Sequence, residues 1–226
     1  MRRLKADLHS HSADDPYDRI AYSTEMLIDT VAGLGYDVLA VTCHDAVVYS
    51  KQLADYAARR GVVFVPGIER RIEGKHVLIL NPDEEQAKVR TFAELRALGK
   101  RRAAVIAPHP FYPTPRSLWK HLARNIDLFD AIEYCSLYSW GLNPNRLALR
   151  AARKAGLPMV GTSDVHQMPY CDTTFTWLEC EPTVEGVVEA IRAGRAWYAS
   201  RPRSTCYAAW AALNAARGMI HNVANP

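Results

Sequence analysis

The sequence predicts an α/β domain built around a parallel sheet, and two patterns support this. Short apolar runs of the strand type alternate with amphipathic helical segments along most of the 226 residues. Four of the helical segments are followed by a glycine where the helix should end: Gly35, Gly61, Gly156 and Gly194. Strands that alternate with helices in this way form parallel sheets, either open or closed into a barrel.

The individual elements follow from the hydrophobic periodicity. Strands are predicted at residues 4–8, 37–42, 62–65, 76–80, 103–107, 129–134 and 159–161, with a late pair at 174–178 and 196–199. Helices are predicted at residues 24–34, 51–60, 84–98, 115–124, 145–155 and 184–193. We expect one domain over residues 1–204 and a tail at 205–226, with one more helix at 208–216 and a frayed end.

Composition narrows the class of protein. A hydrophobic fraction of 49% is enough for a sizeable core, and the net charge of +4 suits a small anionic substrate. That charge is too diffuse to indicate nucleic acid. The five cysteines form no CxxC pair, which argues against a disulfide framework or zinc finger. With no signal peptide or membrane span in the pattern, we expect a cytoplasmic protein without a membrane partner. The oligomeric state is left open.

Residues of the metal-ligand type recur at the predicted strand ends. Six of the eight histidines lie at the end or start of a strand, and only His121 and His221 fall elsewhere. Residues two apart on a strand point the same way, so His9 and His11 should converge, as should Asp164 and His166. The nine candidate ligands are His9, His11, His44, Glu69, His76, His109, Glu133, Asp164 and His166. One ion takes four to six ligands, so this number indicates more than one metal.

Two of these candidates have a second interpretation. His76 opens a strand instead of following one, and a core histidine bonded to backbone would give the same pattern. Cys135 lies on the same strand face as Glu133, and its thiolate could replace the carboxylate as a ligand.

The motifs resemble those of the PHP (polymerase and histidinol phosphatase) family. They are Asp7-Leu8-His9-Ser10-His11-Ser12, His44-Asp45, Gly67-Ile68-Glu69, His109 and Ser163-Asp164-Val165-His166, in family order over about residues 4–200. The resemblance implies a distorted seven-stranded (β/α) barrel with two or three divalent metal ions (Zn, Mn or Fe) at the strand C-termini. It also implies the nine ligands named above, with Glu69 bridging two ions.

One position departs from the family pattern. The family usually has an acidic or histidine ligand about five residues after the second histidine of the first motif, and that position here is Pro16. Asp14 and Asp15 come one or two residues early, and either could take the role if the loop is shorter. We favour Asp15.

The resemblance implies a metal-dependent phosphoesterase acting on a small phosphorylated metabolite or nucleotide, with a hydroxide that bridges two metals attacking phosphorus. Asp45 is a candidate for orienting ligands or moving protons, although a supporting hydrogen bond explains it equally well. Arg70 or Arg71 could grip a phosphate as a two-pronged fork, and Arg70 is favoured as the closer to Glu69. Solvated hairpin arginines would look the same.

Two rival functions remain at this point. An amidohydrolase also opens with HxH on a first barrel strand, but no bridging lysine is evident and Glu69 takes that place better. A metal-binding PHP module without catalytic activity would share the ligands, although the nearly complete ligand set favours an enzyme. Phosphate release in the presence of Mn²⁺ or Zn²⁺ distinguishes the three.

Overall fold

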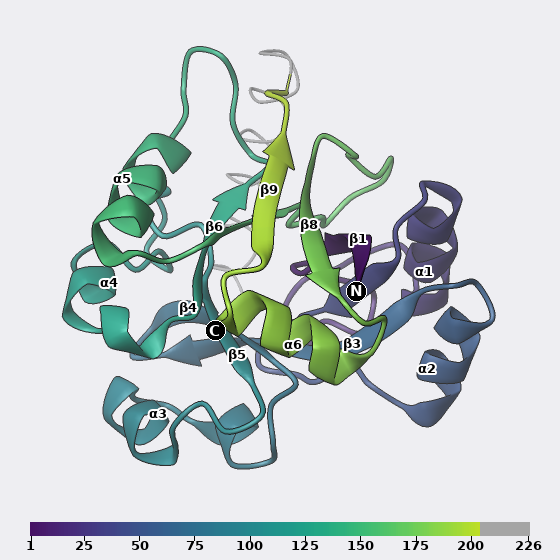
Figure 1. Ribbon diagram of the computed structural model, residues 1–226, viewed down its shortest axis with the longest axis horizontal. Coiled ribbons are helices and arrows are strands. Elements are labelled where there is room, and N and C mark those ends of the chain that lie inside the picture. Colours follow the sequence, from purple (N-terminus) through teal and green to yellow (C-terminus); the bar gives the residue numbers. More distant parts are fainter. Residues whose placement is uncertain (204–226) are drawn as a thin grey trace.

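A computed structural model describes residues 1–203, and a nine-stranded sheet runs through it (Figure 1). The strand order is β7-β6-β5-β4-β3-β2-β1-β8-β9. The strands are β1 (Arg2–Asp7), β2 (Val38–Val41), β3 (Val63–Ile72), β4 (Lys75–Leu80), β5 (Ala104–Ala107), β6 (Ala131–Cys135), β7 (Met159–Thr162), β8 (Thr174–Cys180) and β9 (Ala196–Ser200). The sheet curves into a nearly closed, barrel-like wall, which agrees with the predicted mixed α/β class.

Six α-helices and two short 3₁₀ helices connect these strands within the described residues. They are α1 (Thr24–Gly33), α2 (Lys51–Ala58), η1 (Gln86–Lys88), α3 (Phe92–Leu98), α4 (Lys120–Arg124), η2 (Ile126–Leu128), α5 (Asn145–Ala155) and α6 (Val184–Arg192). The predicted helix at 84–98 is divided, because Thr91 and Glu94 form a capping box that starts α3 anew. No helix within residues 1–203 has the length and apolar character that crossing a bilayer requires. The predicted tail at 205–226, with its helix at 208–216, lies outside the described residues.

The prediction of a parallel sheet is wrong for three strands. β4 runs antiparallel to both β3 and β5, and β8 and β9 are also antiparallel to their neighbours. The cause at β4 is a tight hairpin, because Glu73 and Gly74 both have positive φ and reverse the chain after β3. β3 is also longer than predicted, so Glu69 lies within the strand and not after it.

The two ends of the β1–β7 run meet at one end of the barrel. Ser10 and Val165, just beyond β1 and β7, form a parallel bridge, and the Asp164 amide donates to the His9 carbonyl at 3.0 Å. β8 then adds on the other side of β1, and β9 follows it. The sheet of residues 1–203 therefore has nine strands, and the predicted count of seven is not confirmed.

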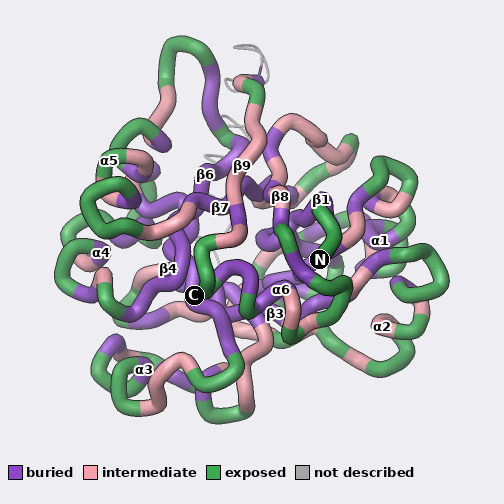
Figure 2. The backbone as a smooth tube through the Cα atoms, viewed as in Figure 1, coloured by how far each residue is buried: buried purple, intermediate pink, exposed green. Residues whose placement is uncertain are grey.

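The other end of the barrel is filled with apolar side chains. One buried cluster joins the inner faces of β1 and β2 to α6, and it includes Leu4, Val38, Leu178, Val187 and Ile191. Figure 2 shows the strands as mostly buried and the outer helices as largely exposed. α6 covers this end of the barrel. Polar side chains inside the barrel are therefore expected to gather at the opposite end, where the parallel strands terminate.

The close packing of β7 against β8 can be tested by a substitution at Gly161. A Cβ added there would lie 2.4 Å from the Phe175 carbonyl oxygen of β8, a contact with backbone that cannot simply rotate away. We expect Gly161→Ala to lower the free energy of unfolding by about 1–3 kcal/mol, as overpacking does. Urea denaturation checks this against Gly33→Ala, whose Cβ would meet nothing within 4 Å. Equal stability of the two variants would contradict the close packing of β7 on β8.

Candidate metal centre

Loops that follow β1, β2 and β7 bring the first candidate ligands together. Asp7 at the end of β1 aligns two of these loops, because it accepts hydrogen bonds from the Ser163 amide (3.1 Å) and hydroxyl (2.5 Å) and from the Tyr170 hydroxyl (2.6 Å). Burial raises the pKa of Asp7, and these donors oppose the shift. The backbone is also strained here, since His109 and Asp164 are non-glycine residues with positive φ. Such conformations persist where surrounding contacts fix them, as in functional sites.

His76 joins this group because β4 is antiparallel. The start of β4 lies at the same end of the barrel as the C-terminal ends of the parallel strands, and His76 pairs with Arg71 of β3. The His76 side chain is close to Glu69, with 2.7 Å between His76 Nδ1 and Glu69 Oε1. The hairpin thus explains how a histidine at a strand start reaches a site formed by strand ends.

Glu69 is the hub of the cluster, and its Oε2 atom faces three histidines. This oxygen lies 3.1 Å from His44 Nε2, 3.4 Å from His11 Nε2 and 3.5 Å from His9 Nε2. Glu69 is only 1% exposed, and burial alone would raise its pKa. The surrounding histidines instead hold the pKa of this carboxyl well below its usual range. The side chain is therefore a carboxylate shared by several imidazoles.

The other oxygen of Glu69 faces a separate pair. Oε1 lies 2.7 Å from His76 Nδ1 and 3.1 Å from His109 Nε2. The first of these contacts lacks hydrogen-bond geometry, and His76 Nδ1 is a buried nitrogen without a hydrogen-bond partner among residues 1–203. The two oxygens of one carboxylate thus face two different sets of nitrogens, as they would in a bridging ligand.

Asp164 provides a second carboxylate on the His9 side, and its side chain is 9% exposed. Its Oδ1 atom lies 3.4 Å from His9 Nε2 and 3.6 Å from His11 Nε2, and Cys135 Sγ is 3.9 Å from its Oδ2. Burial would raise the pKa of Asp164, but His9 and its other neighbours keep the value well below normal. Burial raises the pKa of Cys135 well above its usual value, so the thiol contacts Asp164 as a neutral group.

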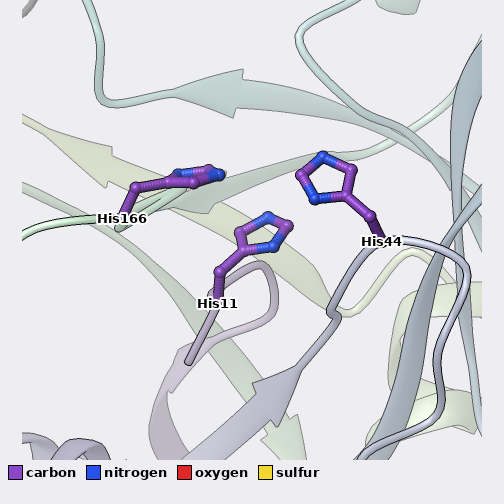
Figure 3. A group of neighbouring side chains, drawn as sticks. All are labelled: His11, His44 and His166. Carbon is purple, nitrogen blue, oxygen red and sulfur yellow. The ribbon is translucent and has the colours of Figure 1, made fainter. Parts of the chain in front are cut away.

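A group of three histidines lies at the solvent-facing side of the cluster. The imidazoles of His11, His44 and His166 come from the loops after β1, β2 and β7 and gather around a common space (Figure 3). Their ring centroids are 4.6 Å apart for His11 and His44 and 4.1 Å for His11 and His166. Burial would lower the pKa of His44, but hydrogen bonds to Asp15 and Glu69 raise it to about 10.

Asp18 belongs to this outer group, and the sequence analysis missed it. Its Oδ2 atom lies 3.2 Å from His166 Nε2 and 3.6 Å from His44 Nδ1. The family pattern places an acidic ligand near Pro16, and only Asp14 and Asp15, which come earlier in the loop, were expected to take this role. A longer loop would place the ligand at Asp18, two residues after Pro16.

Two of the predicted ligands lie behind histidines. Asp15 Oδ2 accepts from the Nδ1 atoms of His11 (3.0 Å) and His44 (2.9 Å), while Glu133 Oε1 is 2.7 Å from His9 Nδ1. Glu133 also accepts from the Thr162 hydroxyl at 2.5 Å and from the His109 amide. These contacts leave the Nε2 atoms of His9, His11 and His44 directed at Glu69. Carboxylates placed in this way orient metal-binding imidazoles and fix their tautomers.

Asp45 and the two arginines form a neighbouring triad. Arg70 Nη1 donates to Asp45 Oδ1 at 2.8 Å, and its other nitrogens donate to the carbonyls of Val89 (2.7 Å) and Lys88 (3.3 Å). Arg71 donates to Asp45 Oδ2 through Nε and Nη2. Alternation along β3 places Arg71, and not Arg70, on the face of Glu69. Arg70 therefore lies on the opposite face of β3 from Glu69, where it bonds to Asp45 and to two carbonyls, and its substrate-binding role stays a prediction.

The donor atoms fit divalent metal ions. The Nε2 atoms of His9 and His11 are 3.2 Å apart, and two nitrogens on one tetrahedral ion with bonds of 2.0–2.1 Å would be about 3.3 Å apart. Groups of three donors that lie within 4.8 Å of one another include His9, His11 and Asp164, and also His44, Glu69 and His76. Mixed imidazole and carboxylate donors suit Zn²⁺, Mn²⁺ or Fe²⁺.

Residues 143–196, from just before α5 to the start of β9, match a family model described as PHP-associated. No curated protein sequence matches the chain at a significant level.

Several solved structures share the fold, each with limited sequence identity. A two-domain protein from Bacteroides vulgatus ATCC 8482, described as containing a predicted PHP-like metal-dependent phosphoesterase, matches with a TM-score of 0.65 and 21% identity. That match covers 86% of this chain but only 64% of the other chain. PsfC from Pseudomonas syringae PB-5123 matches with a TM-score of 0.67 and 16% identity over 99% of both chains.

The fold also occurs in a nuclease. The lesion-specific endonuclease PfuEndoQ from Pyrococcus furiosus matches with a TM-score of 0.62 and 15% identity, over 87% of this chain and 58% of that one. A complex of endonuclease Q with a 27-mer duplex substrate also matches, with a TM-score of 0.54. In that complex an abasic lesion of the duplex lies at the active site of the enzyme. These likenesses show a common fold and leave the substrate open.

Proposed function

We propose that this chain is a PHP-domain protein and that it hydrolyses a phosphoester bond with the help of two or three divalent metal ions. The observation that carries this proposal is Glu69, a buried carboxylate whose two oxygens face five histidine side chains in two separate sets. Such a carboxylate can hold two cations side by side. Paired cations activate water and neutralise the charge of the transferred phosphoryl group.

The contacts support a division of the ligands among the ions. We assign His9, His11, Glu69 and Asp164 to one ion, and Glu69, His76 and His109 to a second. His44, His166 and Asp18 would hold a third ion at the outer edge. In this assignment Asp15 and Glu133 orient the histidines and do not contact an ion, which changes the role that the sequence indicated for them.

The chain's own groups shape the approach of the substrate. His9, His11 and Glu69 are at most 1% exposed, while the side chains of His166 and Asp18 are 35% and 34% exposed. A phosphoester therefore reaches the cluster from the outer side. The Asp45 carboxylate is committed to two arginines, so we assign it the role of holding them in place and not of moving protons.

Substrate size is a separate question. A small phosphorylated metabolite or nucleotide fits a cluster set within loops, and this stays our first candidate. The expectation that nucleic acid is not a partner is not supported, because endonuclease Q, which was solved with duplex DNA carrying a lesion, shares the fold. Monoesters, dinucleotides and oligonucleotides therefore belong in one screen.

The test is turnover by metal-loaded protein. Protein reconstituted with Mn²⁺ or Zn²⁺ should release phosphate from a phosphomonoester or cleave a phosphodiester, and His9→Ala protein should not. Amide and lactone substrates run in parallel address the amidohydrolase alternative. Turnover of amides without turnover of any phosphoester would overturn the proposal. Full metal loading without turnover of either class would favour a metal-binding module.

A further inference from the structure

Four aromatic side chains of residues 1–203 are strongly exposed, and all four lie on loops. Every Phe, Tyr or Trp in residues 1–203 that is more than about a third exposed lies in a segment that follows a strand in the sequence. The four are Tyr17 after β1, Tyr49 after β2, Trp119 after β5 and Trp140 after β6. Aromatic rings exposed next to a reaction centre often contact ligands, because they bury a large apolar area.

Tyr17 is the exposed aromatic that contacts the cluster itself. Its ring meets the His44 ring edge to face, with centroids 6.4 Å apart and an angle of 83° between the planes. The guanidinium carbon of Arg71 lies 4.6 Å from the centroid of the Tyr17 ring, which is a cation–π distance. Tyr17 is nevertheless 52% exposed. The ring is thus backed by Arg71 and still presents much of its surface to solvent beside His44.

Asp45 fixes the arginine that backs this ring. Its Oδ2 atom accepts from Arg71 Nε at 3.2 Å and from Nη2 at 3.0 Å, and its Oδ1 accepts from the Arg71 amide at 2.9 Å. Asp45 is itself held, since its amide donates to the Glu69 carbonyl at 3.0 Å. The guanidinium is therefore oriented before any ligand arrives, and it orients the Tyr17 ring in turn.

We propose that Tyr17, backed by Arg71, is a stacking platform that selects phosphoesters whose organic group carries a flat aromatic ring, such as an aryl group or a nucleobase. This inference rests on the proposed phosphoesterase function. Stacked and edge-to-face rings lie 4.5–7 Å apart, which is the scale of the Tyr17–His44 separation. Because the half-exposed Tyr17 ring contacts His44 of the cluster, the organic group of a phosphoester bound at the cluster would lie near this ring. A saturated ring of the same size has no π face to match.

Two phosphonates that the protein cannot hydrolyse test this directly. Benzylphosphonate and cyclohexylmethylphosphonate carry the same charged head and rings of similar size, but only the first ring is aromatic. Calorimetry on Mn²⁺-loaded protein should show about ten-fold tighter binding of benzylphosphonate, near the upper end of what one aromatic pair contributes. Tyr17→Leu should abolish this preference and Tyr17→Phe should keep it. Tyr49→Leu, an exposed ring that stacks on Phe64, is the matched control and should change nothing.

Each result has a separate meaning. Equal binding of the two phosphonates by the unmodified protein, or a preference that survives Tyr17→Leu, would overturn the platform and leave the phosphoesterase proposal standing. Loss of the preference in Tyr49→Leu would also overturn it, because the selecting ring would then be another one. If neither phosphonate binds to fully metal-loaded protein, the platform is overturned, and the phosphoesterase proposal is decided separately by the turnover screen.

Discussion

Glu69→Gln should lower kcat/KM for the best phosphoester substrate by roughly 100-fold or more, beyond the 10- to 100-fold typical of losing a group that only supports a ligand. The substitution keeps the size of the side chain but removes the negative charge that five histidines face. Without this charge, the repulsion between two cations bound next to each other is no longer offset. Steady-state kinetics at saturating Mn²⁺, together with metal analysis of the same sample, measures the effect.

The control for this prediction is Glu84→Gln. The Glu84 side chain is 93% exposed, so the variant makes the same chemical change on the surface and should leave the kinetics unchanged. Circular dichroism should show that both variants are folded, since the apolar cluster under α6 does not involve Glu69. Near-normal turnover by a folded Glu69→Gln protein would refute a bridging role for this carboxylate.

Removal of metal should have the second large effect. A chelator should abolish turnover, and added Mn²⁺ or Zn²⁺ should restore it. The apoprotein should also melt at a lower temperature, because ions that bind only the folded state stabilise it by about 4 kcal/mol at a thousand-fold excess over Kd, or roughly 10 °C for a chain of this size. Elemental analysis after reconstitution should find at least two ions per chain. One ion or none would contradict the cluster.

Metal content can also test whether Asp18 binds an ion. If Asp18 binds an outer ion with His44 and His166, Asp18→Asn should lower the metal content by up to one ion per chain and leave the inner ions in place. Asp14→Asn is the matched control, because Asp14 lies in the same loop but bonds to Ser12 and Thr24. Equal metal content in both variants would remove Asp18 from the ligand set.

Much of the fold was readable from local patterns. The predicted helix at 145–155 coincides with α5, and eight of the nine predicted strands lie within a few residues of their observed limits. The exception is β3, predicted as 62–65 and observed as Val63–Ile72. Its second half reads Gly-Ile-Glu-Arg-Arg-Ile, and charged residues there interrupt the apolar run. Pairing with β4 extends the strand, and that pairing is not visible in the periodicity.

The candidate site shows the same division. The pattern of histidines and carboxylates at strand ends indicated which residues gather, and His9, His11, His44, Glu69, His76, His109 and Asp164 do lie together. Their roles were less accessible. Glu133 and Asp15 have the chemistry of ligands, and only their hydrogen bonds to the Nδ1 atoms of histidines place them behind those rings.

The sequence by itself determined the α/β class, the order of the elements and the pool of candidate ligands, because hydrophobic period and residue chemistry are local properties. The tertiary structure decided the direction of β4, which carries His76 to Glu69, and the commitment of Arg70 to Asp45 and to the carbonyls of residues 88 and 89. It also decided that Asp18 reaches His166. These outcomes depend on distances between segments far apart in the chain, and such distances are set by packing and not by any one segment.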